Sequence, residues 1–85
     1  MRKTPDDFGE RELDLVYIAK KLKDALRLES LLTERGIDYL VEPDHYVGGL
    51  LFRTERIGAF FYVDPGVNEA AKAVLLENGM TPHSP

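Results

Sequence analysis

The residues best suited to bind a ligand lie in one segment, Asp44 to Arg56, which contains a Gly-Gly pair and two arginines. Consecutive glycines let backbone amides approach a bound group closely, and guanidinium groups donate paired hydrogen bonds to carboxylates and phosphates. The segment therefore predicts a site for a small anionic ligand or a protein partner. It matches no phosphate-binding fingerprint, so a plain flexible connection remains the alternative. The predicted contact residues are Tyr46, Gly48, Gly49, Arg53 and Arg56.

The sequence contains no recognisable catalytic or metal-binding constellation. The chain has no cysteine, and Ser30 and Ser84 fall in a helical pattern and near the C-terminus. No pair of carboxylates is set apart by an apolar environment. Glu42, Asp44 and His45 are close in sequence, but alternate side chains of an extended backbone point apart and cannot converge on one ion. We therefore expect a protein that is not an enzyme and that uses no metal or cofactor.

Composition and charge narrow the class of protein further. The net charge of the 85-residue chain is −4 at pH 7, which on average repels a phosphate backbone, so nucleic-acid binding is not expected. Positive charge clusters at Lys20, Lys21, Lys23 and Arg27, which we expect to face water at a helix start. No apolar run is long enough to span a membrane, and the charged N-terminus does not resemble a secretory signal. A chain without cysteine suits a reducing compartment, so we expect a cytoplasmic protein.

The elements that must position these residues follow from apolar periodicity. The β-branched and aromatic run from Leu13 to Ala19 predicts a strand. Residues 22–35 predict a helix that Gly36 ends in the left-handed conformation. Lys21 stands where a capping residue is preferred, so the helix start is poorly capped. The apolar stripe of this helix consists of Leu22, Ala25, Leu28 and Leu32, widened by Leu26 and Leu31.

The second half of the chain predicts two strands and a helix. Residues 37–42 read as a half-buried strand that Pro43 ends, because proline cannot donate to a ladder. Residues 50–52 are a candidate short strand, and residues 54–56 then turn the chain into the main strand, Ile57 to Val63. Asp64 and Pro65 mark a helix start. The stripe of that helix consists of Val67, Ala70, Ala71, Val74 and Leu75, and Gly79 ends it.

This order of elements predicts one α+β domain over residues 13–80. Residues 1–12 are expected to be a flexible tail, and residues 81–85 a C-terminal tail or a short final edge strand. The predicted fold is a ferredoxin-like βαββα(β) sandwich, an antiparallel sheet with two helices on one face. Right-handed crossovers place the first strand and the strand from Ile57 to Val63 side by side in the centre.

One face of that sheet has no predicted cover. Both central strands are apolar on both sides, whereas a strand with one wet face normally alternates with polar residues. An exposed apolar patch usually marks a partner, and a second copy of the chain is the simplest one. We therefore expect a homodimer formed through the open face. Its residues would be Leu15, Tyr17, Phe60 and Tyr62.

Two of these strands also resemble the RNA-recognition motif. Residues 16–22 look like the short ribonucleoprotein motif on the first strand of that domain, and residues 56–63 partly resemble the longer motif on its third strand. The resemblance implies that Tyr17 and Tyr62 stack on the bases of single-stranded RNA. Ile57 and Gly58 break the Gly-aromatic pair of that pattern, and the chain is acidic. RNA binding is therefore the alternative function.

A longer resemblance covers residues 13–80. It is carried by Leu15–Ala19, by Gly36, by Tyr46 with Gly48–Gly49, and by Phe60–Val63. In these positions the chain resembles a family of small bacterial signal-transducing proteins, a domain of unknown function close to the nitrogen-regulatory PII-like fold. The resemblance implies a PII-like, ferredoxin-like, dimeric module and assigns no ligand or catalytic residue. The leading prediction is thus a PII-like binding or signalling module that contacts its ligand through residues 44–56.

Overall fold

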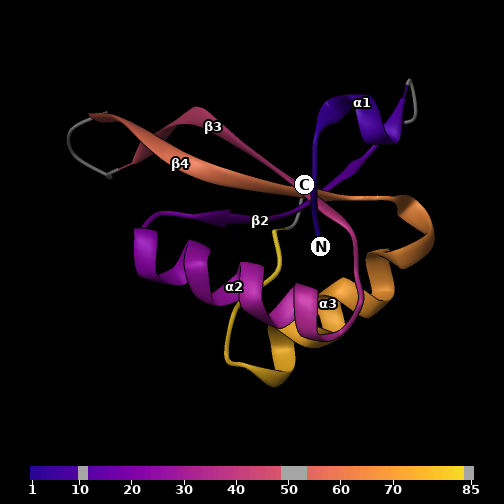
Figure 1. Ribbon diagram of the computed structural model, residues 1–85. Coiled ribbons are helices and arrows are strands. Elements are labelled where there is room, and N and C mark those ends of the chain that lie inside the picture. Colours follow the sequence, from indigo (N-terminus) through magenta and orange to yellow (C-terminus); the bar gives the residue numbers. More distant parts are fainter. Residues whose placement is uncertain (10–11, 49–53, 84–85) are drawn as a thin grey trace.

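The structure is a computed structural model that describes residues 1–9, 12–48 and 54–83. Within these ranges the chain is an α+β fold, compatible with a ferredoxin-like arrangement, in which α2 and α3 lie on one face of a sheet and α1 lies on the other (Figure 1). The elements in chain order are β1 (Arg2–Lys3), α1 (Pro5–Phe8), β2 (Asp14–Ala19), α2 (Leu22–Glu34), β3 (Tyr39–Gly48), β4 (Thr54–Val63), the 3₁₀ turn η1 (Pro65–Val67) and α3 (Asn68–Glu77). No helix in the described ranges has the length and apolar character needed to cross a membrane.

The sheet is mixed, with the described strands in the order β1-β3-β4-β2. The prediction that the first long strand lies beside the strand ending at Val63 is confirmed, because β2 pairs antiparallel with β4. The prediction of a wholly antiparallel sheet is wrong, because β1 pairs parallel with β3. On the outer side of β2, residues 81–83 run alongside without forming a described strand, and the His83 amide donates to the Val16 carbonyl at 2.7 Å. Among the described strands, β2 is therefore an edge strand and β4 is central.

The main core lies between the sheet and the pair α2 and α3. Alternate residues of β3 and β4 face the helices, so that Tyr39, Phe61 and Val63 are buried there together with Val16 of β2. The rings of Tyr39 and Phe61 pack with their centroids 5.9 Å apart. The helices contribute Ala25, Leu28, Leu32, Ala71, Val74 and Leu75.

Both long helices end at the glycines that the sequence predicts. Gly36 and Gly79 have φ angles of 69° and 73°, in the left-handed region that favours glycine. The amides of the residues that follow, Ile37 and Met80, donate back to the carbonyls of Leu32 and Leu75, each at 2.9 Å. This closure of the last turn is the Schellman arrangement, and it carries Ile37 and Met80 into the core.

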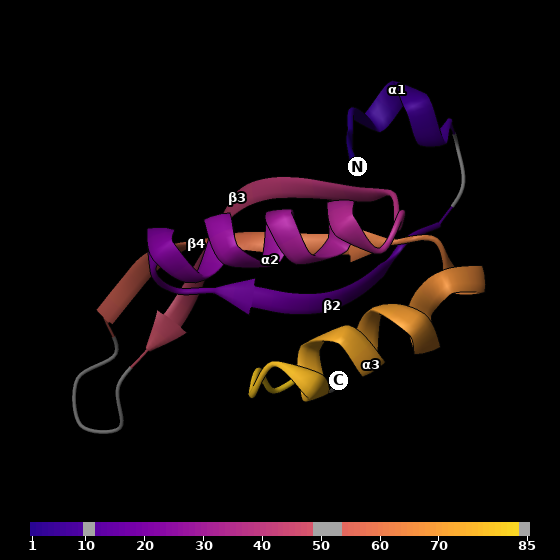
Figure 2. The same cartoon turned by 60° about the horizontal axis from the view of Figure 1, so that its bottom comes forward.

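The ribbon formed by β3 and β4 is longer than predicted. Pro43 lies inside β3, and residues 54–56 are part of β4, where the sequence predicted a strand end and a turn. Proline is tolerated because β1 pairs only with Tyr39 and Leu40, which leaves one side of β3 without a described strand neighbour at Pro43. Figure 2 shows this ribbon extending beyond the end of the molecule where α2 begins. The candidate strand at residues 50–52 lies outside the described residues.

Three predicted core positions, Leu22, Leu26 and Ala70, are exposed instead. Leu22, in the first turn of α2, is 75% exposed, and Ala70 of α3 also faces solvent. Figure 1 shows the ribbon of β3 and β4 rising away from α2 at the end where that helix starts, and Leu22 of its first turn lines an open hollow there. Helical periodicity identifies which side of a helix is apolar, but it does not show how far along the helix the sheet follows.

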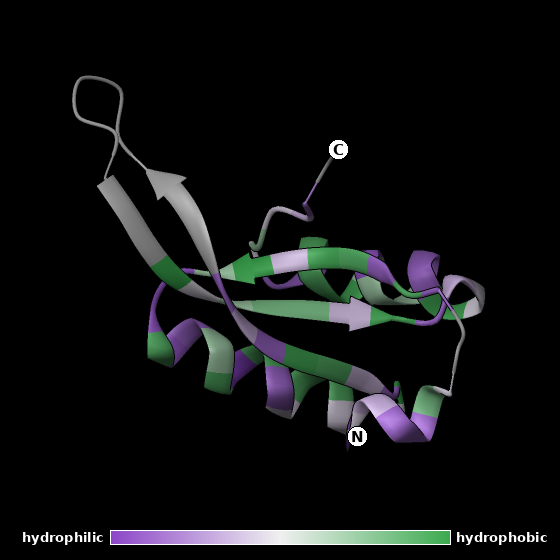
Figure 3. Ribbon diagram, turned by 90° about the horizontal axis from the view of Figure 1, so that it is seen from above, coloured by the Kyte–Doolittle hydropathy of each residue, from purple (hydrophilic) through white to green (hydrophobic). Residues whose placement is uncertain are grey.

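The face of the sheet opposite the main core is partly covered by the N-terminal residues. Phe8 of α1 is only 7% exposed, and Leu40 and Phe60, which face this side, are also buried. Tyr39 donates its amide to the Met1 carbonyl at 3.0 Å, and a capping box with Thr4 and Asp7 starts α1. The expectation of a loose tail therefore does not describe residues 2–8. Figure 3 shows hydrophobic residues concentrated on the strands, between this layer and the layer of α2 and α3.

Replacing Phe8 by alanine tests this second layer. We expect Phe8→Ala to lower the free energy of unfolding by about 2 kcal/mol, the transfer free energy of a buried phenylalanine side chain. Leu76→Ala is the matched control, because the Leu76 side chain is 66% exposed and its loss should cost less than about 0.5 kcal/mol. Urea unfolding followed by circular dichroism measures both. Equal stability of the two variants would show that Phe8 does not hold α1 to the sheet.

Candidate functional site

The described part of the predicted ligand segment, residues 44–48 and 54–56, belongs to the paired strands β3 and β4. Tyr46 in β3 pairs with Arg56 in β4, and Gly48 pairs with Thr54, so the backbone brings these predicted contact residues to one end of the sheet. Gly49 and Arg53 lie outside the described residues. The structure therefore places three of the five predicted residues on paired strands rather than in a free loop.

The four residues predicted for the open face do not share one face. Leu15 pairs with Tyr62, but Tyr17 pairs with Phe61, because the register of β2 shifts between Leu15 and Tyr17. Such an irregularity inserts one extra residue, here Val16, and reverses the alternation that follows it. Tyr17 consequently packs against the main core on the helix side, which corrects its predicted place on the open face. The remaining open-face aromatics are Phe60, which is buried, and Tyr62, which is half-buried.

A more open site lies beside Tyr17, where the chain leaves β2 and enters α2. A groove of about 570 Å³ runs between the first turns of α2 and the C-terminal segment 79–83. We call it the basic groove. Its polar lining side chains are Tyr17, Lys20, Lys21, Asp24, Arg27, Thr81 and His83.

Local structure on both sides of the basic groove sets the positions of these side chains. β2 ends at Ala19, the chain bends at Lys20, and Lys21 precedes α2 with an extended backbone and no side-chain cap bond. On the other side, left-handed Gly79 turns the chain back after α3, and buried Met80 anchors it. The hydrogen bond from the His83 amide to the Val16 carbonyl then holds the segment against the edge of β2. The groove is thus built from two consecutive elements, β2 and α2, and a C-terminal segment that is far from them in sequence.

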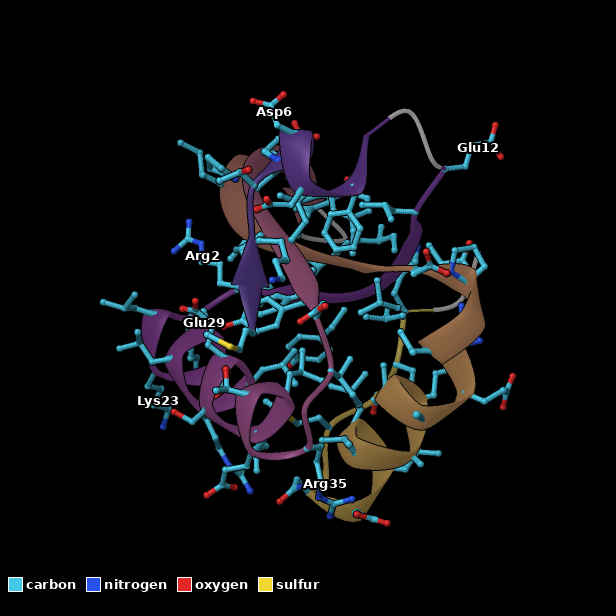
Figure 4. All side chains as sticks on the ribbon, turned by 45° about the vertical axis from the view of Figure 1, so that its right-hand side comes forward. Arg2, Asp6, Glu12, Lys23, Glu29 and Arg35 are labelled. Atoms are coloured by element: carbon cyan, nitrogen blue, oxygen red, sulfur yellow. The ribbon has the colours of Figure 1, made fainter. Side chains whose placement is uncertain are left out.

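The charge of the basic groove is opposite to that of the whole chain. Lys20, Lys21 and Arg27 face a single lining carboxylate, Asp24, in a protein whose net charge is −4. Lys23 does not line the groove, and Figure 4 shows its side chain directed away from the sheet. The cluster that the sequence suggested would simply face water is therefore divided, with three of its four members gathered around one hollow.

The pKa of the Tyr17 hydroxyl depends on its burial and on the charges of the basic groove. Burial raises the pKa of Tyr17 above its ordinary value of 10.0, the nearby Asp24 carboxylate raises it further, and the Arg27 guanidinium lowers it. Tyr17 is therefore protonated at neutral pH and offers a hydroxyl donor to the groove. Because the folded pKa lies above the unfolded one, the stabilisation from the neutral hydroxyl is present below pH 10. It is lost as the pH rises through the folded pKa.

The other described polar contacts are structural. Arg35 near the end of α2 pairs with Glu77 of α3 at 2.7 Å, and Asn68 donates to Asp14 at 2.6 Å, which ties the start of α3 to β2. Arg2 of β1 lies 3.7 Å from Glu29 of α2, and Figure 4 shows both on the same side of the molecule. Among the described residues, no three acidic or histidine side chains are grouped closely enough to hold a metal ion.

Comparison with known proteins adds no assignment, because no family model, curated protein or solved structure matches this chain. The site must therefore be interpreted from its own geometry. The positive cluster from Lys20 to Arg27 is visible in the sequence, but no sequence pattern links it to Tyr17 or His83. The only available signal was the excess of positive charge in an acidic chain, and nothing in the sequence places His83 opposite α2.

The titration of Tyr17 tests the arrangement of charges in the groove. We expect Arg27→Gln to raise the pKa of Tyr17, because it removes the cation that favours the tyrosinate, and Asp24→Asn to lower it, because it removes the anion that opposes it. Ultraviolet absorbance of tyrosinate, with the curve of Tyr17→Phe subtracted, measures both shifts. Two shifts of the same sign would contradict the placement of Tyr17 between these charges.

Proposed function

We propose that this protein is a non-enzymatic binding module with a ferredoxin-like, PII-like fold, and that it holds a small anionic ligand in the basic groove. The observation that carries the proposal is the gathering of Lys20, Lys21 and Arg27 around one hollow of an acidic chain. Like charges held together repel, and a bound anion would convert that repulsion into attraction. Arginine and lysine are also the usual partners of carboxylates and phosphates.

The start of α2 strengthens this interpretation. The N-terminus of a helix carries a partial positive charge, so cations beside it are unfavourable and anions are favourable. Two lysines precede α2, and no described side chain caps its first amides. The groove therefore combines lysine charge with the positive end of a 13-residue helix. An anion seated there would neutralise both.

The size of the groove suits a small molecule. Its volume of about 570 Å³ lies inside the range of roughly 300–1,000 Å³ that is usual for ligand pockets. The Tyr17 hydroxyl and the Thr81 side chain add neutral hydrogen-bonding groups to the cations. We infer a ligand with one or more carboxylate or phosphate groups and a small polar body.

The PII-like part of the proposal rests on the order of the elements. β2, α2 and β3 form one strand–helix–strand unit, and β4, α3 and the C-terminal segment form a second. The two units meet where β2 pairs with β4. Figures 1 and 2 show the β3–β4 ribbon extending from the same end of the sheet where α2 begins. The predicted contact residues Tyr46 and Arg56 thus belong to the same end of the molecule as the basic groove.

The alternative function, binding of single-stranded RNA, has less support. It requires exposed aromatic rings on one open face, and Tyr17 lies on the other face. Phe60 is only 9% exposed, so a base could stack on it only if its cover moved. The groove for a small anion requires no such rearrangement.

Anion titrations test the proposed function. We expect citrate, inorganic phosphate or adenosine monophosphate to bind the parent protein at low salt, and Lys21→Gln and Arg27→Gln to weaken binding about tenfold each through the lost charge-assisted contact. Lys23→Gln is the matched control, since it removes the same charge from the same helix outside the groove. Isothermal calorimetry measures all four proteins. The proposal would be contradicted if the parent protein bound none of the three anions. It would also be contradicted if Lys23→Gln weakened binding as much as Lys21→Gln and Arg27→Gln do.

The homodimer stays a prediction. α1 and Phe8 cover part of the face that was expected to be open, and Glu42 and Asp44 are exposed on β3, so the apolar surface left for a second copy is smaller than expected. We expect sedimentation velocity to show a dimer formed through the uncovered part of this face. A strict monomer at high concentration would remove the dimer from the proposal.

A further inference from the structure

A second hollow adjoins the basic groove and has a different chemical character. It has a volume of about 280 Å³ and lies between the first turn of α2 and the β3–β4 ribbon. We call it the apolar hollow. Lys20 and Lys21 line both hollows, so the two sites lie on opposite sides of this pair of lysines. Its apolar lining side chains are Ala19, Leu22, Ala25, Val41, Pro43, Ile57 and Ala59.

The apolar hollow exposes large hydrophobic side chains that no described element covers. Leu22 is 75% and Ile57 is 66% exposed. Ile57, Ala59 and Phe61 alternate along β4 and share the helix-facing side, but only Phe61 is fully covered by the core. The hollow is therefore the outer end of the main core, left open because the ribbon continues past the start of α2 (Figure 2).

The charged groups around the apolar hollow are all cations. Arg2, Lys20 and Lys21 are its charged lining residues, and its described lining includes no carboxylate. Arg2 also lies 3.7 Å from Glu29 of α2, whereas Lys20 and Lys21 lie directly beside the first turn of α2. An apolar cavity bordered by positive charge is complementary to a molecule that has an apolar body and one anionic end.

We propose that the apolar hollow binds the alkyl chain of a small amphiphilic anion, an alkyl carboxylate, whose carboxylate lies against Lys20 and Lys21. The inference rests on the proposed function only in using these two lysines as the anion contact. A group the size of a water molecule occupies about 30 Å³. The hollow of about 280 Å³ therefore holds roughly nine such groups, which corresponds to an alkyl chain of about eight to ten carbon atoms.

A series of alkyl carboxylates tests the proposal, with hexanoate, octanoate, decanoate and dodecanoate added below their micelle concentrations. We expect each added methylene to strengthen binding roughly threefold to fourfold until the hollow is filled, and no further gain beyond about ten carbons. Calorimetry gives the affinities, and backbone amide shifts in nuclear magnetic resonance spectra give the location. Acetate lacks the long alkyl chain and decanol lacks the carboxylate. Each should therefore bind at least about tenfold more weakly than decanoate.

Two variants and a control locate the alkyl chain. Ile57→Asp and Leu22→Ser should each weaken decanoate binding at least about tenfold. Leu26→Ser should leave decanoate binding unchanged, because Leu26 is on the same helix and 54% exposed but does not line the hollow. Ile57 and Leu22 are exposed, so these substitutions should leave the fold intact, and circular dichroism checks this directly.

The same variants separate this inference from the proposed function. Citrate binding should survive Ile57→Asp, because Ile57 does not line the basic groove. If citrate binds and decanoate does not, the alkyl carboxylate proposal is overturned while the anion site stands. If decanoate binds with the expected chain-length plateau and citrate does not, the apolar hollow is supported and the anion proposal fails. Equal weakening of decanoate by Leu26→Ser would also overturn the proposal.

Discussion

The rest of the structure depends on the burial of β4 on both of its faces. Phe61 and Val63 face α2 and α3, and Phe60 faces the opposite side, where α1 lies. A strand that is apolar on both sides must be covered on both sides, or it leaves a large apolar surface in water. The helices α2 and α3 cover one of these faces. The N-terminal residues cover part of the other, which is why a segment with little apolar content forms an ordered strand and helix.

This two-sided packing also determines where the two hollows lie. The helices cover β4 only from about Ala59 onward, and the ribbon continues past the start of α2. Both hollows lie at this end, one between α2 and the C-terminal segment and the other between α2 and the ribbon. Lys20 and Lys21 stand between them at a helix start that disfavours cations. Positive charge, an open helix end and uncovered apolar side chains are therefore concentrated in one region, while the rest of the described surface carries ordinary structural ion pairs.

The irregularity of β2 at Val16 links the fold to the site. The extra residue turns Tyr17 from the open face to the helix side, where its hydroxyl reaches the basic groove. The Val16 carbonyl also accepts the hydrogen bond that holds the C-terminal segment beside β2. One residue in an edge strand thus turns an aromatic ring away from the open face and helps to close the wall of the basic groove. No sequence pattern marks Val16, because a β-branched residue is equally suitable for a regular strand.

The sequence by itself determined the local elements of this protein. Periodicity identified both long helices, glycines located their C-terminal ends, and β-branched runs identified the three long strands, because each signal depends on neighbouring residues. The Asp64-Pro65 signal marked the 3₁₀ turn η1, and α3 begins after it, at Asn68. The tertiary structure decided the rest. It ordered residues 2–8 against the sheet, extended β3 through Pro43, and left Leu22 and Ile57 uncovered. It also brought Lys21, Arg27 and His83 together. These outcomes depend on contacts between distant segments, and local patterns contain no information about which segments will meet.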